Sequence, residues 1–312
     1  MKKLLSFLTI ALLAATSLFA QDMESATNLY NEGAQALNEG DKTTALKCFE
    51  DALAQGEALG AEAEELVFNC KKNIPVIILS IGKEQASAKN IDEAIATLKT
   101  AVEKAEAYGQ AEIGQEAKDL IPQLFMQQGN IYLNQKDFEN AINNYKKVLE
   151  INPNDGRAYL YLGQALSRTG DLQGALEALK KAEENGQEKN AKKVSSKLYL
   201  TLANAALQKK DFEKSLDYAE QSLAIMQDAT ALQIAGKAAS ALKNHDKVIE
   251  YFEKLIELNP NGNKAAEFRY TIATSYEAKG DKANACVNYK AIVSVPQFKE
   301  YATYKVKELK CQ

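Results

Sequence analysis

A pattern that recurs seven times constrains this chain more than any other feature of its sequence. Each copy has an acidic or polar turn, a small or β-branched residue, an aromatic, leucine or alanine four residues later, and a small or apolar residue three further on. The first fixed position of the copies holds, in order, Ala45, Ala94, Ala141, Ala175, Ser215, Val248 and Ala285. These positions are 33 to 49 residues apart. A period in this range predicts a stacked array of similar units.

A second small residue precedes each fixed position by twelve residues. These residues are Gly33, Gly82, Gly129, Gly163, Ala203, Gly236 and Ala273. Glycine or alanine lets two helices approach closely, and the spacings of three and four residues place the apolar positions on one helical face. Each unit is therefore predicted to be a helix, a short turn and a second, antiparallel helix.

The composition supports an all-α chain. Alanine is abundant, whereas the 312 residues include only 16 glycines, 5 prolines and no tryptophan. Alanine favours helices, and glycine and proline interrupt them. The apolar content of 46% argues against disorder. The formal charge of −4 argues against a protein that binds the phosphate backbone of nucleic acids.

These residues resemble the tetratricopeptide repeat, whose unit of about 34 residues is a helical hairpin. Gly129, Ala141, Tyr145 and Pro153 stand at four of the family's preferred positions. A second copy, with Gly236, Phe252 and Pro260, matches three. The resemblance runs from about residue 26 to residue 297. It implies a right-handed α-solenoid of about seven repeats, which we place within residues 21–297.

Two of the spacings between repeats are longer than the family's unit. The additional residues lie within 61–73 and 111–120, and each segment leads to an Ile-Pro pair, at Pro75 and Pro122. We interpret them as extra turns before the first helices of the second and third repeats. Since proline kinks the interior of a helix, a bend or break is expected near each.

The resemblance also implies a binding surface. In this family, the first helices of the hairpins line a concave groove that commonly holds a peptide or a partner helix. Residues 2, 5, 9 and 12 of each unit should face it, and the polar or aromatic ones are Tyr30, Asn130, Arg157, Gln164, Asn204, Gln233, Lys237 and Tyr270. Asparagine and glutamine both donate and accept hydrogen bonds, so they could bind an extended backbone. The alternative is a solvated helix face without a ligand.

One specialised type of groove is not expected. Family members that grip a C-terminal carboxylate use Lys, Arg and Asn on adjacent repeats. The corresponding residue types here, Lys83, Asn130, Arg157 and Lys237, are scattered along the chain.

The N-terminus has the pattern of a secretory signal peptide. Lys2 and Lys3 precede an apolar stretch that ends at Ala20, and polar sequence follows. We predict cleavage after Ala20 and export, to the periplasm or alternatively to the extracellular space or the cell envelope. The alternative is a membrane anchor, although the stretch is short for a span.

The four cysteines suggest disulfide bonds in an exported chain. Cys48 and Cys70 are equally far from the predicted helix reversal near Gly60, and Cys286 and Cys311 bracket Pro296. We therefore predict the pairs Cys48–Cys70 and Cys286–Cys311, one at each end of the array. The alternative is four buried free thiols.

No catalytic constellation is visible in the sequence. The single histidine, His245, lies in a predicted turn, so Cys-His zinc sites and HExxH metalloprotease sites are excluded. No glycine-rich phosphate-binding loop follows a strand pattern. The sequence predicts neither a cofactor nor a metal site, and it argues against an enzyme.

Residues 298–312 are predicted to form a helix that caps the last repeat. Phe298, Tyr301 and Leu309 recur at helical spacing and could cover its apolar face. The alternative is an aromatic surface for self-association.

Together these features predict an exported bacterial scaffold without catalytic activity. It would bind a peptide or a partner protein in the groove, and it would bind neither nucleic acid nor, after cleavage, a membrane. An architectural or self-associating protein of the cell envelope is the alternative function.

Overall fold

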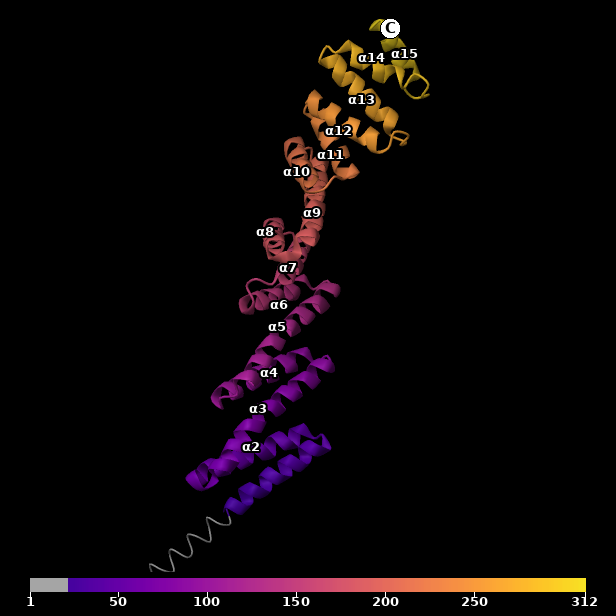
Figure 1. Ribbon diagram of the computed structural model, residues 1–312. Helices are drawn as coiled ribbons and strands as arrows, with labels where there is room; N and C mark the ends of the chain where they lie inside the picture. Colours follow the sequence, from indigo (N-terminus) through magenta and orange to yellow (C-terminus); the bar gives the residue numbers. More distant parts are fainter. Residues whose placement is uncertain (1–21) are drawn as a thin grey trace, which may run out of the picture. The chain divides into compact units, whose positions relative to one another are not determined.

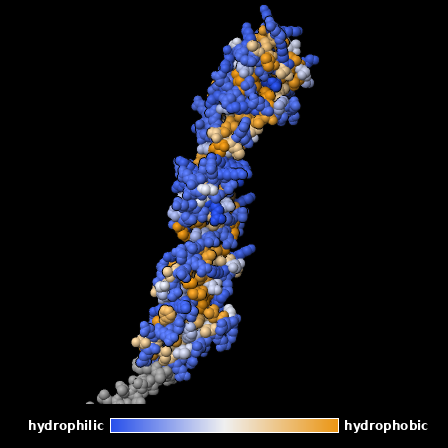
Figure 2. All heavy atoms as spheres, in the orientation of Figure 1, coloured by the Kyte–Doolittle hydropathy of each residue, from blue (hydrophilic) through white to orange (hydrophobic). Residues whose placement is uncertain are grey.

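The computed structural model describes residues 22–312, and their regular structure is helical throughout. Hydrophilic side chains cover most of the surface visible in Figure 2, with apolar residues between them. The predicted N-terminal signal peptide, residues 1–20, lies outside the described residues. None of the described helices is long and apolar enough to cross a membrane.

The chain divides into two compact units, residues 1–153 and 154–312. In the first unit, three helical hairpins follow one another (Figure 1). Their helices are residues 22–39 with α2 (Lys42–Leu59), α3 (Glu64–Ser87) with α4 (Ile91–Ala107), and α5 (Ala111–Asn134) with α6 (Phe138–Ile151).

The second unit contains four more hairpins and a final helix. The hairpins are α7 (Gly156–Thr169) with α8 (Leu172–Ala182), α9 (Glu188–Gln208) with α10 (Phe212–Ile225), α11 (Ala229–Ala241) with α12 (His245–Leu258), and α13 (Ala265–Ala278) with α14 (Lys282–Lys290). The last helix is α15 (Lys299–Glu308). The seven predicted hairpins are therefore present, and the chain is an all-α solenoid of repeats.

The two rows of small residues lie where paired helices cross. All fourteen positions are buried, and Gly129 is representative of them. A β-carbon added to Gly129 on α5 would lie 2.6 Å from Cε1 of Tyr145 on α6. Gly163 faces Leu179 and Gly236 faces Phe252 in the same way. The repeat in the sequence is thus a repeat of helix crossings, and at Gly33, Gly82, Gly129, Gly163 and Gly236 the small residue admits a large one.

The turn inside each hairpin has one design. A residue with positive φ ends the first helix, and the next residue, Asp or Asn, is the N-cap of the second. The positive-φ residues are Gly40, Lys89, Lys136, Gly170, Lys210, Lys243 and Gly280. In six of the seven turns, the side chain of the N-cap residue accepts a hydrogen bond from a backbone N–H three residues later. Asn90 is the N-cap residue whose side chain makes no such bond.

The hairpin of α9 and α10 has hydroxyl groups at its crossing. Ser215 Oγ donates a hydrogen bond to the carbonyl of Ala203 at 2.9 Å. Ser222 Oγ contacts both the hydroxyl and the carbonyl oxygen of Ser196 at 3.0 Å. All three serines are buried, so these hydrogen bonds satisfy groups that would otherwise be costly to remove from water.

Helices α3 and α5 correct one prediction. The extra residues of the second and third repeats lengthen the first helices at their N-terminal ends, as expected. However, Pro75 and Pro122 lie inside continuous helices of 24 residues each, with no break. Both helices pack along neighbours on two sides, and these contacts retain the helical path through each proline. Helix α9 is also long, at 21 residues, which the sequence analysis did not predict.

The predicted Cys48–Cys70 disulfide is wrong in this structure, because both cysteines are free. Cys48 Cβ lies 3.1 Å from the position of a β-carbon added to Gly33, so Cys48 faces the first helix of its own hairpin. The side of α2 that packs against α3 instead includes Gly56, where an added β-carbon would approach Leu66. Equal distance from a helix reversal is thus not enough, because the two side chains must also point at each other.

Helix α15 occupies the segment that was expected to cap the last repeat. It packs against α14, and its Ala302 is fully buried. A disulfide joins Cys286 on α14 to Cys311 after α15, as predicted for this end of the chain. The aromatic rings of Phe298 and Tyr301 pack on Tyr270 of α13, with centroid distances of 5.3 and 5.4 Å.

Candidate functional site

The candidate site lies on the exposed sides of α7, α9 and α11 in the second unit, which we call the first-helix face. These are the first helices of three successive hairpins, and α9 contacts both α7 and α11. Five of the eight residues predicted to line a binding groove lie on this face: Arg157, Gln164, Asn204, Gln233 and Lys237.

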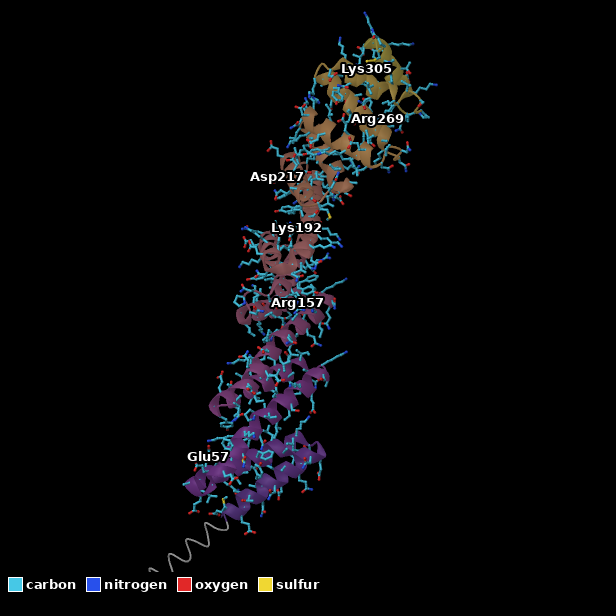
Figure 3. The ribbon with its side chains drawn as sticks, viewed as in Figure 1. Glu57, Arg157, Lys192, Asp217, Arg269 and Lys305 are labelled. Carbon is cyan, nitrogen blue, oxygen red and sulfur yellow. A yellow bond between two sulfur atoms is a disulfide. The ribbon has the colours of Figure 1, made fainter. Side chains whose placement is uncertain are left out.

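On α7, Arg157 and Gln164 lie on one side of the helix because they are seven residues apart. Arg157 is exposed and Gln164 is half-buried. The start of the helix is fixed by Asp155, whose carboxylate accepts hydrogen bonds from the backbone N–H groups of Arg157 and Ala158. Gly156 packs so closely that an added β-carbon would lie 2.1 Å from the carbonyl oxygen of Asn185. Arg157 therefore extends from a well-anchored helix end (Figure 3).

On α9 and α11, residues of the face alternate with buried residues. Exposed Asn204 follows Ala203, which is buried at the crossing with α10. Gln233 is half-buried and Lys237 exposed, one turn apart on α11. Gly236, next to Lys237, packs against Phe252 of α12. The tight packing behind the face thus holds its polar side chains toward solvent.

Tyr30 and Asn130 belong to the first unit, and both already have partners there. The Tyr30 ring packs edge-on against Phe49 at 5.1 Å, and its hydroxyl accepts a hydrogen bond from Asn73 Nδ2 at 3.4 Å. Asn130 Oδ1 accepts a hydrogen bond from the Tyr145 hydroxyl at 2.9 Å. Tyr30 therefore makes contacts within its hairpin and with the next one, and Asn130 makes a contact within its hairpin.

Tyr270, the last of the predicted groove residues, is covered by the rings of Phe298 and Tyr301 from the C-terminal segment. Burial and the neighbouring Tyr301 raise the pKa of Tyr270. Its ring therefore forms part of the packing between α13 and α15.

The second helices of the second unit carry hollows that the sequence analysis missed. One, of about 530 Å³, lies between α10 and α12 and includes Leu223, Leu232 and Tyr251 in its lining. Another, of about 470 Å³, lies between α8, α9 and α10. The positions of these hollows depend on how successive hairpins pack against each other. The periodic pattern within each hairpin does not specify that packing.

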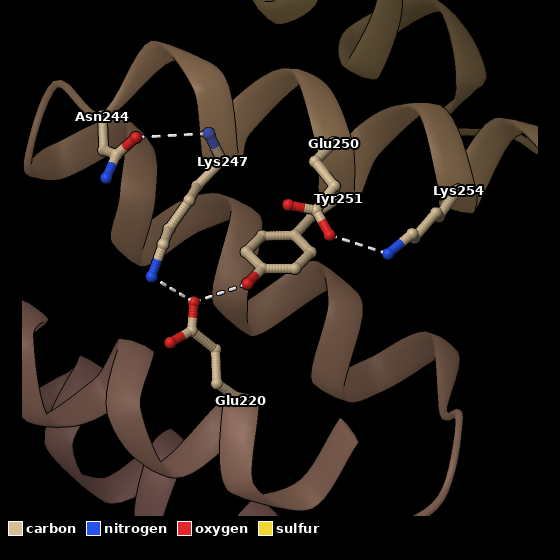
Figure 4. Close-up of polar contacts among 6 residues, drawn as sticks. All are labelled: Glu220, Asn244, Lys247, Glu250, Tyr251 and Lys254. Carbon is tan, nitrogen blue, oxygen red and sulfur yellow. Dashed lines mark hydrogen bonds and ion pairs between the residues drawn. The ribbon is translucent and has the colours of Figure 1, made fainter. Parts of the chain in front are cut away.

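A polar cluster borders the first of these hollows (Figure 4). Glu220 Oε1 on α10 accepts hydrogen bonds from Lys247 Nζ and from the Tyr251 hydroxyl on α12, each at 2.5 Å. Burial and the carboxylate of Glu220 raise the pKa of Tyr251. The three groups satisfy one another and join two successive hairpins, so their arrangement is that of a structural contact.

The described residues show no arrangement suited to nucleophilic or metal chemistry. No group of three or more His, Cys, Asp or Glu residues within 22–312 could hold a metal ion. His245 is the first residue of α12, capped by Asn244, and not a turn residue as predicted. Burial raises the pKa of Cys70 to about 11, so its thiol is protonated at neutral pH.

Two segments match known families. Residues 129–170 match a family described as TPR repeat, and residues 229–261 match one described as tetratricopeptide repeat. Curated relatives include Hsp70-Hsp90 organizing protein 1 of Glycine max, 28% identical over 169 residues, and heat shock protein STI1 of Saccharomyces cerevisiae, 28% identical over 170 residues. These alignments cover 50% and 53% of this chain but only 28% and 26% of the relatives.

Solved structures with similar regions include MamA, with 26% identity, a TM-score of 0.36, and coverage of 58% of this chain and 94% of that chain. Another is YrrB, described as a TPR protein with an unusual peptide-binding site, with 18% identity, a TM-score of 0.36, and coverage of 64% and 97%. Residues 129–170 and 229–261, which fold as helices of successive hairpins, are thus similar to tetratricopeptide repeats.

Proposed function

We propose that this protein is a scaffold without catalytic activity, and that its first-helix face holds a peptide or an extended segment of a partner protein. The observation that carries the proposal is the row of outward-facing polar side chains on α7, α9 and α11, supported from behind by close helix crossings. Side chains held on rigid helices lose little freedom when a ligand binds, which favours affinity. The two segments that match tetratricopeptide repeats support the same interpretation.

Site-specific photo-crosslinking tests the proposal. A photoreactive benzoylphenylalanine replaces Asn204 on the first-helix face, and the matched control replaces Glu213, which is exposed on α10. Irradiation of producing cells should give a crosslinked partner from position 204 and none from position 213. Equal crosslinking from both positions, or none from position 204, would contradict the proposed site.

Export is part of the proposal. Residues 1–20 have the charge and apolar pattern of a signal peptide, and a disulfide such as Cys286–Cys311 persists in oxidising compartments. We propose a periplasmic, envelope-associated or secreted mature protein. N-terminal sequencing of the protein purified from its native cells should begin at Gln21. A chain that retains Lys2 and Lys3 would contradict cleavage.

Self-association is the second candidate function. Val287 on α14 and Tyr304 on α15 are exposed by 61% and 58%, and Tyr301 by 41%. Exposed apolar and aromatic side chains near one end of a chain favour contact with a second copy. Sedimentation velocity across a hundredfold concentration range should show a dimer that Tyr304→Ser weakens. A strict monomer throughout that range would exclude this function.

A further inference from the structure

The first helices of the second unit carry a charge opposite to that of the whole chain. Helices α7, α9 and α11 contain two arginines and five lysines against one acid, Glu188. The second helices of the same hairpins, α8, α10 and α12, contain eight acids against five lysines. The formal charge of the chain is −4. Positive charge is therefore concentrated on one side of each hairpin.

Besides Lys189 near the start of α9, five of these cations lie on the exposed sides of their helices. They are Arg157, Arg168, Lys193, Lys197 and Lys237. Arg157, Gln164 and Arg168 recur at seven and four residues, which places them on one side of α7. Lys193, Lys197 and Asn204 share one side of α9 for the same reason. Helix α9 contacts both α7 and α11, so the helices that carry these cations are neighbours.

These five cations have no ion pair among residues 22–312, whereas six other lysines of the unit do. Lys192, on another side of α9, is paired with Glu183 and Glu188 (Figure 3). On the second helices, Lys214 is paired with Asp211, Lys247 with Glu220 and Lys254 with Glu250. Of the acids near the first-helix face, Glu183 and Glu188 pair with Lys192. Asp155 and Asp228 accept hydrogen bonds from backbone N–H groups at the starts of α7 and α11.

Such a surface suits an anionic ligand. Lys193 and Lys197 are one turn apart and repel each other, which a bound anion would relieve. The arginines can bind a carboxylate with two parallel hydrogen bonds. The amides of Gln164, Asn204 and Gln233 can both donate to and accept from a peptide backbone. Charge and hydrogen-bonding capacity therefore coincide on this face.

We propose that the segment held by the first-helix face is an extended peptide rich in Asp and Glu, within the partner chain and not restricted to its C-terminus. This inference rests on the proposed scaffold function and specifies the chemistry of the partner. Packed helices are about 8–10 Å apart, so three first helices span about 20 Å. An extended chain advances about 3.3 Å per residue, which corresponds to a segment of about six to seven residues.

Peptide titration of the full mature chain tests the charge requirement. The probe is a fluorescein-labelled peptide of twelve residues that alternates Glu and Ser, with an amidated C-terminus, and the reference peptide alternates Gln and Ser. Fluorescence anisotropy should show binding of the Glu peptide, at least tenfold weaker binding of the Gln peptide, and a loss of affinity of about tenfold between 25 and 200 mM NaCl. Equal affinity for the two peptides would overturn the inference.

A pair of charge-matched variants locates the binding surface. Lys193→Gln/Lys197→Gln/Lys237→Gln removes three cations from the first-helix face. Lys180→Gln/Lys214→Gln/Lys254→Gln removes three from the second helices and changes the net charge equally. The first variant should bind the Glu peptide at least tenfold more weakly than wild type, and the second within twofold. Similar losses in both would overturn the inference, as would tighter binding of a single-stranded DNA oligomer than of the Glu peptide.

The two proposals fail by different results. If the crosslinker at position 204 captures a partner through a neutral or basic segment, the scaffold function stands and the acidic ligand is wrong. If it captures no partner, the scaffold function itself is contradicted, whatever the synthetic peptides do.

Discussion

The ring of Tyr145 on α6 occupies the space that a side chain at Gly129 on α5 would need. A β-carbon at position 129 would lie 2.6 Å from Cε1 of the ring, and the ring is fixed at its other end by the hydrogen bond from its hydroxyl to Asn130. A glycine faces a large side chain in the same way in four other hairpins, at Gly33, Gly82, Gly163 and Gly236.

Gly129→Ala should therefore destabilise the first unit even though alanine is the better helix former. Overpacking at a tight crossing lowers the free energy of unfolding by about 1–3 kcal/mol, and the higher helix propensity of alanine raises it by about 1 kcal/mol. Urea denaturation should give a net loss of up to about 2 kcal/mol in the free energy of unfolding. Gly114→Ala on the same helix is the control, since its added β-carbon would lie 3.3 Å from Ala105 Cβ. A loss for Gly114→Ala as large as that for Gly129→Ala would contradict this account.

The C-terminal disulfide should stabilise α15 locally. Cys286 and Cys311 are 25 residues apart, and closing a loop of this size contributes about 3 kcal/mol in the chain-entropy estimate. Cys311→Ser should increase amide hydrogen exchange in α15 and leave α3 to α5 unchanged. Thiol titration of the unreduced, denatured mature chain should find the two free cysteines, Cys48 and Cys70. Unchanged protection of α15 in the variant would show that its packing alone holds it.

Acid should weaken the contact between α13 and α15 through Glu277. Burial alone would raise the pKa of Glu277, but hydrogen bonds from Lys305 and Tyr289 and the charge of Lys305 outweigh it and leave the pKa below the usual 4.5. A carboxyl whose pKa is lower in the folded state contributes stability above its unfolded pKa and loses it as the pH falls through the folded pKa.

Glu277→Gln should accordingly lower the free energy of unfolding by about 1 kcal/mol at pH 7 and by less at pH 3. Urea denaturation at the two pH values measures the difference. Glu267→Gln, an exposed position on the same helix, serves as control and should cost less than about 0.5 kcal/mol at either pH. If Glu277→Gln lowered the free energy of unfolding equally at both pH values, the carboxylate would not be the cause of the loss.

The shared carboxylate of Glu220 should couple Lys247 and Tyr251 energetically. Both donate to Glu220 Oε1, so removing one changes the environment of the other. A double-mutant cycle with Lys247→Met and Tyr251→Phe should give an interaction energy of about 0.5–1 kcal/mol from urea denaturation. The contacts are independent if the changes in the free energy of unfolding of the two single variants add up to that of the double variant within about 0.3 kcal/mol.

The hairpins could be predicted because their signals are local. The small residues at positions such as Gly163 and Ala175 are twelve apart in sequence and meet across one turn, so the sequence alone specifies the crossing. The start of α12 differs from the prediction by one residue: Asn244 is the N-cap, and His245, predicted to lie in a turn, is the first residue of the helix. An error of this size leaves the hairpin intact.

What could not be predicted depends on packing between hairpins. A break near Pro75 was one of the two predicted outcomes, but this residue is fully buried within a continuous helix. Cys48 and Cys70 were paired by distance along the chain, although Cys48 faces its own hairpin. Tyr270, predicted to face a groove, is half-buried and packs against Phe298 and Tyr301, which follow it by about 30 residues. The excess of cations on α7, α9 and α11 was readable in the sequence, but its significance required knowing which lysines are paired.

The turn that joins the two helices of every hairpin affects how a chain of this kind can change in length during evolution. Each turn is closed by residues of its own hairpin, a positive-φ residue followed by an Asp or Asn N-cap. Recombination that inserts or deletes one complete hairpin therefore includes the turn of that hairpin and leaves the turns of the other hairpins unchanged. Proteins of this design can gain or lose whole modules, so the length of the ligand segment they accommodate can evolve in steps of one helix.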